Sequence, residues 1–136
     1  MKDKEDPVFE RKIGEWIEDT LGEAIQDTQD LWNSLRNGVV LCRLLNKLRP
    51  GIIKKFNDSQ KLNHLQEIEN IQLYLGACAR LGMDSSNLFT IPDLHSRKSI
   101  SSVLQNLHAL SKIPFGLNVS GGITYSANSS KERKKF

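Results

Sequence analysis

Apolar side chains recur at helical spacing along most of this chain, and no stretch alternates polar and apolar residues with the period of two typical of a strand. The spacing predicts a first helix from Phe9 to Leu21, with Gly22 as its stop. Residues 1–8 are largely polar and charged, with Pro7 as a break, and are expected to form a flexible lead-in.

Two helical segments are predicted before residue 50. Residues 27–37 indicate a short helix, and residues 39–48 are apolar on most sides, which is typical of a helix buried around most of its circumference. Asn37 is expected to cap this central helix, because an Asn side-chain oxygen accepts a hydrogen bond from a free amide of the first turn. Pro50-Gly51 is expected to end it.

A basic loop and a long helix follow. The loop spans residues 52–61, with Phe56 as its one large anchor. The helix is predicted from about Leu62 to Arg80, with Gly82 as its stop. Its predicted buried stripe consists of Leu65, Ile68, Ile71, Leu75, Cys78 and Ala79.

The last predicted helix follows a compact segment around Phe89 that Pro92 interrupts. Ser96 is its expected cap, and its apolar face consists of Ile100, Val103, Leu104, Leu107 and Leu110. From residue 117 the composition changes to Gly, Ser, Asn and charge, so residues 117–136 are expected to be a disordered basic tail or linker. The pattern predicts one all-α domain over residues 9–116, with four main helices and two or three short ones.

The composition of the 136 residues, 38% hydrophobic and 26% charged, is that of an ordinary globular domain. No apolar run approaches the roughly 18 residues that span a bilayer, and the charged first residues do not resemble a signal peptide. Two Cys without a secretory signal favour reduced thiols. We therefore expect a cytoplasmic, monomeric protein without a membrane span.

The charges are unevenly placed. Residues 13–30 carry six acidic side chains and no Lys or Arg, whereas residues 31–61 carry seven basic side chains and one acidic. Either region could be a solvated helix face, or each could meet a partner of opposite charge. Residues 1–116 carry 15 basic and 15 acidic side chains, which argues against nucleic-acid binding. The candidate contacts for an acidic partner are Lys47, Arg49, Lys54, Lys55 and Lys61, with Lys131, Arg133, Lys134 and Lys135 in the tail.

The residue types that catalysis or metal binding needs do not form a recognisable motif. Cys42 and Cys78 belong to no CxxC pair and are interpreted as small buried hydrophobes. No phosphate-binding G-x-x-x-x-G-K-[ST] occurs. Trp16 and Trp32 are interpreted as core residues rather than a ligand platform. We therefore expect no enzymatic activity, no metal and no cofactor.

Several segments of the ordered region form a recognisable set. They are EWIE at residues 15–18, DL at residues 30–31 with the run from Leu35 to Gly51, ENI at residues 69–71, LF at residues 88–89 and PDL at residues 92–94. Together they resemble the calponin homology domain. The region is most similar to the single-copy type found in calponin, transgelin and the Vav exchange factors. The positions that match the family signature are expected to be core and turn residues: Trp16, Leu35, Gly38, Leu41, Leu45, Pro50 and Phe89.

The resemblance implies a binding module of the actin cytoskeleton. On this hypothesis F-actin, which is acidic, or another cytoskeletal protein meets the basic residues above, and the protein is cytoskeleton-associated. The alternative is a regulatory, autoinhibitory domain of a Rho-family guanine nucleotide exchange factor, attached to its exchange domain in the same chain. Binding of the same basic loop to an acidic tubulin tail is a third hypothesis.

Overall fold

The computed structural model describes residues 7–27 and 30–114, and this part of the chain is helical without any strand. The predicted all-α fold with four main helices and short additional ones is therefore confirmed. The main helices are α1 (Pro7–Leu21), α3 (Val39–Leu48), α4 (His64–Arg80) and α6 (Ile100–Ser111). The short segments are α2 (Leu31–Leu35), the 3-10 helix η1 (Ser85–Asn87) and α5 (Ile91–His95).

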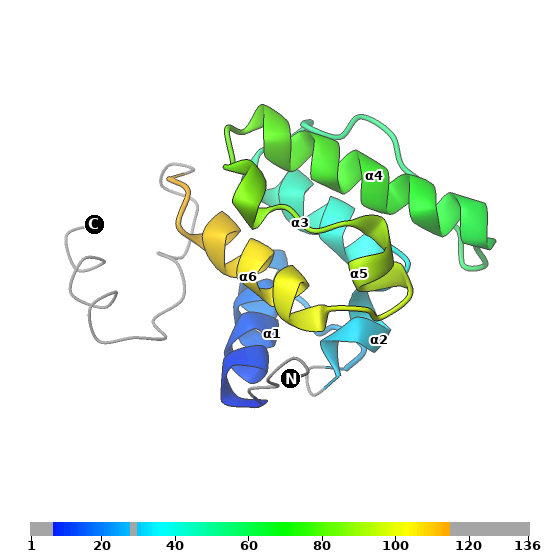
Figure 1. The fold of residues 1–136 in the computed structure, drawn as a ribbon. Helices are drawn as coiled ribbons and strands as arrows, with labels where there is room; N and C mark the ends of the chain where they lie inside the picture. The colour runs from blue at the N-terminus through cyan, green and yellow to red at the C-terminus, as the bar shows by residue number, and fades with distance from the viewer. Residues whose placement is uncertain (1–6, 28–29, 115–136) are drawn as a thin grey trace.

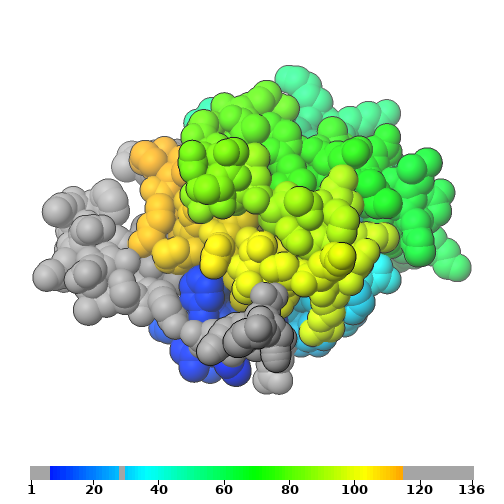
Figure 2. Space-filling model, viewed as in Figure 1, coloured from blue at the N-terminus to red at the C-terminus, as the bar shows by residue number. Residues whose placement is uncertain are grey.

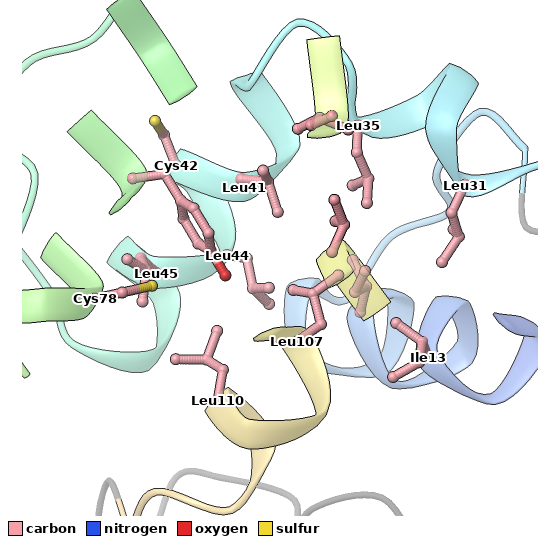
Figure 3. Packing of buried hydrophobic residues seen from close by; sticks show 14 of the residues in the cluster. Ile13, Leu31, Leu35, Leu41, Cys42, Leu44, Leu45, Cys78, Leu107 and Leu110 are labelled. Atoms are coloured by element: carbon pink, nitrogen blue, oxygen red, sulfur yellow. The ribbon is translucent and has the colours of Figure 1, made fainter. Parts of the chain in front are cut away.

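Helix α3 lies at the centre of the domain, with α4 on one side and α1 on the other (Figure 1). Helix α5 packs against both α4 and α6, and α6 returns to pack on α1. Leu44 of α3 and Leu107 and Leu110 of α6 extend into the same interior space (Figure 3). The N-terminal half and the C-terminal half thus share one core.

The positions singled out by the family resemblance are mostly interior. Six of them are buried: Trp16, Leu35, Gly38, Leu41, Leu45 and Phe89. Pro50 is exposed in the turn that follows α3, where its fixed φ suits a chain reversal. The six buried residues support the fold and are not available to a partner.

Two helix starts differ from the sequence-based expectation. Helix α1 begins at Pro7 rather than at Phe9, because proline fits the first turn of a helix, where an amide has no intrahelical partner. Helix α6 begins after Ser99, whose hydroxyl accepts a hydrogen bond from the Ser102 amide, whereas Ser96 ends α5. Both shifts follow from local capping chemistry.

The buried face of α4 is rotated from the predicted stripe. Leu65 is 73% exposed and Ala79 is exposed, whereas Glu67, Asn70 and Tyr74 are buried with Ile71. The helix starts at His64 rather than Leu62, because Asn63 and Gln66 form a reciprocal capping box. The prediction assumed that apolar residues mark the buried side, but here polar residues with hydrogen-bond partners occupy it.

Asn70 joins three segments from the middle of the fold. Its Nδ2 donates to the carbonyl oxygens of Asn37 (3.0 Å) and Asn57 (2.8 Å), and its Oδ1 accepts from the Asn57 amide (2.8 Å). The turn before α3 and the loop before α4 are therefore both fixed to α4. In the loop, Ile53 is the fully buried apolar residue, and the predicted anchor Phe56 is only half-buried.

The turn before α3 requires glycine at residue 38. Gly38, not Asn37, occupies the N-cap position with φ +80°, although the Asn37 side chain still accepts from the Val39 amide at 3.0 Å. A Cβ on Gly38 would lie 2.5 Å from Cβ of Asn70. The backbones of α3 and α4 therefore approach each other closely here.

Replacing Gly38 with alanine is expected to lower the free energy of unfolding by about 3 kcal/mol, since left-handed backbone strain and a steric clash add together. Gly51 is the matched control, because it has the same φ of +80° with nothing within 4 Å of its Cβ position. Gly51→Ala should therefore cost only the backbone strain, about 1 kcal/mol. Urea unfolding of both variants measures the difference, and equal losses would contradict the close approach.

Candidate partner-binding surface

The basic loop runs back along α4 from its C-terminal end toward its N-terminal end (Figure 1). Near its start, the carbonyl oxygen of Ile52 accepts a hydrogen bond of 2.7 Å from Arg80 at the end of α4. Further along, the Asn57 side chain donates to the Gln66 carbonyl (3.3 Å) and to Glu69 Oε1 (2.9 Å) in the first half of α4. The loop thus lacks secondary structure but is held to α4 at its start, by Ile52, and at its middle, by Asn57.

The basic strip, defined here as Lys47, Arg49, Lys54, Lys55 and Lys61, is exposed throughout. Lys54 and Lys55 lie between the buried Ile53 and the half-buried Phe56, so the backbone beneath them is anchored. Within the described part of the chain, Lys47, Lys54, Lys55 and Lys61 form no ion pair. Their ammonium groups therefore remain available to an acidic partner.

The other two basic residues of residues 31–61, Arg36 and Arg43, are not part of the strip. Arg43 forms an ion pair with Glu23, and Arg36 forms one with Glu67 at 3.4 Å. The remaining candidates, Lys131, Arg133, Lys134 and Lys135, lie outside the described residues. The strip consists of five of the nine basic residues proposed from the sequence.

Two carboxylates that precede residue 31 accept hydrogen bonds from backbone amides within the domain. Glu18 accepts a hydrogen bond of 2.9 Å from the Ile25 amide, and Glu10 accepts one of 2.8 Å from the Leu31 amide. These carboxylates hold the segment between α1 and α2 against α1. The solvated-face interpretation of residues 13–30 is therefore incomplete, because Glu18, one of their six acidic side chains, binds a backbone amide, whereas Glu10 lies before that region.

The two cysteines are interior groups. Burial raises the pKa of the Cys42 thiol to about 12 and that of Cys78 to about 11, so both are neutral near pH 7. Among the described residues no cluster of His, Cys, Asp and Glu could hold a metal ion. In the same part of the chain, none of the helices has the length and apolar character needed to cross a bilayer.

Both tryptophans were predicted to be core residues, and Trp32 is less buried than this prediction requires. Trp16 is buried as expected, but Trp32 is only half-buried. Its indole Nε1 donates to the carbonyl oxygen of Leu94 at 2.8 Å, and the guanidinium carbons of Arg36 and Arg97 lie 5.6 and 4.9 Å from its ring centre. Arg36 is four residues from Trp32, but Leu94 and Arg97 are more than 60 positions away, so no sequence pattern indicated their contacts with the indole.

His108 gives the domain a predictable pH dependence. Its ring packs edge-on against Phe9 at 5.5 Å, and burial, followed by repulsion from Lys112, lowers its pKa below 6.5. The unfolded chain therefore takes up a proton at His108 before the folded chain does, and stability falls as the pH drops below about 6.5. His108→Phe should lose less stability than the original chain between pH 7.5 and 5.5, as measured by urea unfolding. Equal losses of stability in the variant and the original chain would show that His108 does not cause the pH dependence.

The described residues form a small helical domain with one shared apolar core and an exposed basic strip. A sequence profile of the calponin homology (CH) domain matches residues 8–114. The chain therefore belongs to the calponin homology family, as the resemblance indicated.

Relatives include both signalling and calponin-type proteins. The chain is 42% identical over 109 residues to Rac guanine nucleotide exchange factor B of Dictyostelium discoideum, covering 80% of this chain but 9% of that protein. It is 33% identical over 138 residues to calponin-1 of Meleagris gallopavo, covering 100% of this chain and 74% of calponin-1. A solved structure of Vav1 inhibited by an allosteric inhibitor superimposes with a TM-score of 0.75 at 26% identity, covering 96% of this chain and 26% of the solved chain.

Proposed function

We propose that this chain is a non-enzymatic interaction module that binds F-actin through its basic strip, in a cytoplasmic, cytoskeleton-associated protein. Calponin homology families are typically non-enzymatic, and the similarity to calponin-1 supports a cytoskeletal partner. The observation that carries the proposal is the set of exposed lysines that have no acidic partner in the described part of the chain. Opposite charge guides the two surfaces together, and the anchored loop keeps the lysines in place.

Reversing the charges of Lys54 and Lys55 to glutamate is expected to weaken F-actin binding at least tenfold, because two attractive contacts become repulsive. Both side chains are exposed, so the free energy of unfolding should change by less than about 0.5 kcal/mol. Co-sedimentation with filaments measures the affinity, and thermal unfolding measures the stability.

Two controls separate a local contact from a general charge effect. The neutral variants Lys54→Gln and Lys55→Gln should bind with intermediate affinity. Lys98→Glu makes the same single charge change as Lys54→Glu, but in the turn before α6. It should leave F-actin binding nearly unchanged. Equal losses for Lys98→Glu and Lys54→Glu would count against the strip as the contact.

A second candidate function follows from the exchange-factor relatives. Similarity at 42% identity to a small part of Rac guanine nucleotide exchange factor B supports a regulatory domain that holds an attached exchange domain inactive. If the reading frame continues into an exchange domain, deleting residues 1–116 should raise nucleotide exchange. Unchanged exchange by the shortened protein would remove this function.

A further inference from the structure

We propose that the contact with F-actin extends from the basic strip onto the outward face of α4, where Gly76 allows the filament to approach the helix backbone closely. This extension rests on the proposed function of the strip. The face, called here the α4 ridge, consists of Leu65, Glu69, Leu73, Gly76 and Arg80, all of which are exposed. Figure 2 shows α4 at the surface of the molecule, with atoms of the basic loop beside it at the upper edge.

The spacing of the ridge residues puts them on one side of the helix. They are separated by four, four, three and four positions, and residues three or four apart in an α-helix are neighbours on its surface. Leu65 is 73% exposed and Leu73 is 37% exposed, and Val8 is the other exposed large apolar residue in the described part of the chain. Most of the exposed large apolar side chains therefore lie on this ridge.

The basic loop runs beside the α4 ridge because two ridge residues bind it. Arg80 donates a hydrogen bond of 2.7 Å to the carbonyl oxygen of Ile52. About three turns earlier in the helix, Glu69 Oε1 accepts one of 2.9 Å from the side chain of Asn57. The loop segment between these two contacts carries two lysines of the basic strip. The strip and the ridge therefore form one continuous surface.

Gly76 has no role inside the domain that requires a glycine. It lies in the interior of α4, it lacks the positive φ of Gly38, and a Cβ added to it would have no atom within 4 Å. Glycine inside a helix lowers stability relative to alanine, because the unfolded chain has more freedom to lose. Nothing within the described chain compensates for this loss. A residue without a Cβ does, however, allow another molecule to approach the backbone closely.

The charges beside the ridge indicate what covers it. Lys54, Lys55 and Arg80 form no ion pair within the described part of the chain. The occupant therefore carries carboxylates, together with apolar surface that contacts Leu65 and Leu73. A second copy of this chain, packed ridge to ridge, would place these cations against each other. An acidic filament that binds the strip covers the adjoining ridge in the same contact.

The test is co-sedimentation of the 136-residue chain and its Gly76 variants with F-actin, with thermal unfolding measured alongside. Gly76→Ala is expected to raise the Tm by about 4 °C, because alanine favours the helix. Gly76→Gln also favours the helix over glycine, so its Tm should rise too. Its affinity for F-actin should nevertheless fall about tenfold, because the added side chain blocks the close approach. Weaker binding by a more stable variant cannot be attributed to unfolding.

Ser96→Gln is the matched control, because it adds bulk at an exposed residue in the turn between α5 and α6, outside the α4 ridge. It should leave the affinity for F-actin unchanged. The inference is overturned, and the proposed function is not, if Gly76→Gln binds as well as the original chain while Lys54→Glu binds more weakly. A lower Tm for Gly76→Ala would overturn it as well, since the glycine would then serve the fold. If the original chain does not pellet with filaments, both fail.

Discussion

Replacing Asn70 with leucine is expected to lower the free energy of unfolding by about 4 kcal/mol, because three backbone groups lose their partners in or near the core. These groups are the carbonyl oxygens of Asn37 and Asn57 and the amide of Asn57. Leucine has the same branching and number of side-chain heavy atoms as asparagine and is somewhat larger, so no cavity opens. Urea unfolding followed by circular dichroism measures it.

Gln72→Leu is the matched control on the same helix. Gln72 is exposed, and the same change from a carboxamide to leucine should alter stability by less than about 0.5 kcal/mol. The Asn70 variant should also loosen the loop that carries Lys54 and Lys55, which faster amide exchange at residues 53–57 would report. A loss below about 1 kcal/mol for Asn70→Leu would show that the network contributes little.

Truncating Trp16 to alanine is expected to cost about 4 kcal/mol, the usual penalty for removing a large aromatic side chain from a core. The side chain is 5% exposed on α1 and belongs to the shared apolar core. Its indole N–H has no hydrogen-bond partner among the described residues, so the loss arises from packing. Thermal and urea unfolding of the variant measure the cost.

Trp16→Phe separates packing from the indole group. Because no hydrogen bond is lost, phenylalanine should recover most of the stability and cost about 1 kcal/mol. A variant Trp16→Ala that unfolds at the same urea concentration as the original chain would place this residue outside the energetic core.

Apolar periodicity was sufficient to predict the helices whose buried faces are mainly apolar. The face of α6, from Ile100 to Leu110, is buried as the spacing predicted, and α3 spans the predicted residues. For α4 the rule predicted the helix and the burial of Ile71 and Cys78, but it was wrong for Leu65, which is exposed, and it missed the buried Glu67 and Asn70. Periodicity treats a polar residue as exposed, so it misses buried polar side chains that bind distant groups.

The basic strip and the contacts around Trp32 differ in how far the sequence predicted them. The basic strip is mostly contiguous in the chain, so charge counting found Lys54 and Lys55 directly. The contacts of Trp32 with Leu94 and Arg97 join distant parts of the chain, and the position of Arg97 depends on its left-handed backbone. Arginine is not a residue that signals such a turn, so only the folded arrangement places it beside Trp32.

Co-sedimentation of the 136-residue chain with F-actin across a salt series tests the central claim, that the exposed lysines contact an acidic filament. We predict that the chain pellets with filaments at about 50 mM salt and that binding weakens steadily toward about 200 mM, as screening shortens the range of the charges. Absence from the pellet at every salt concentration, for a chain shown to be folded, would contradict the account.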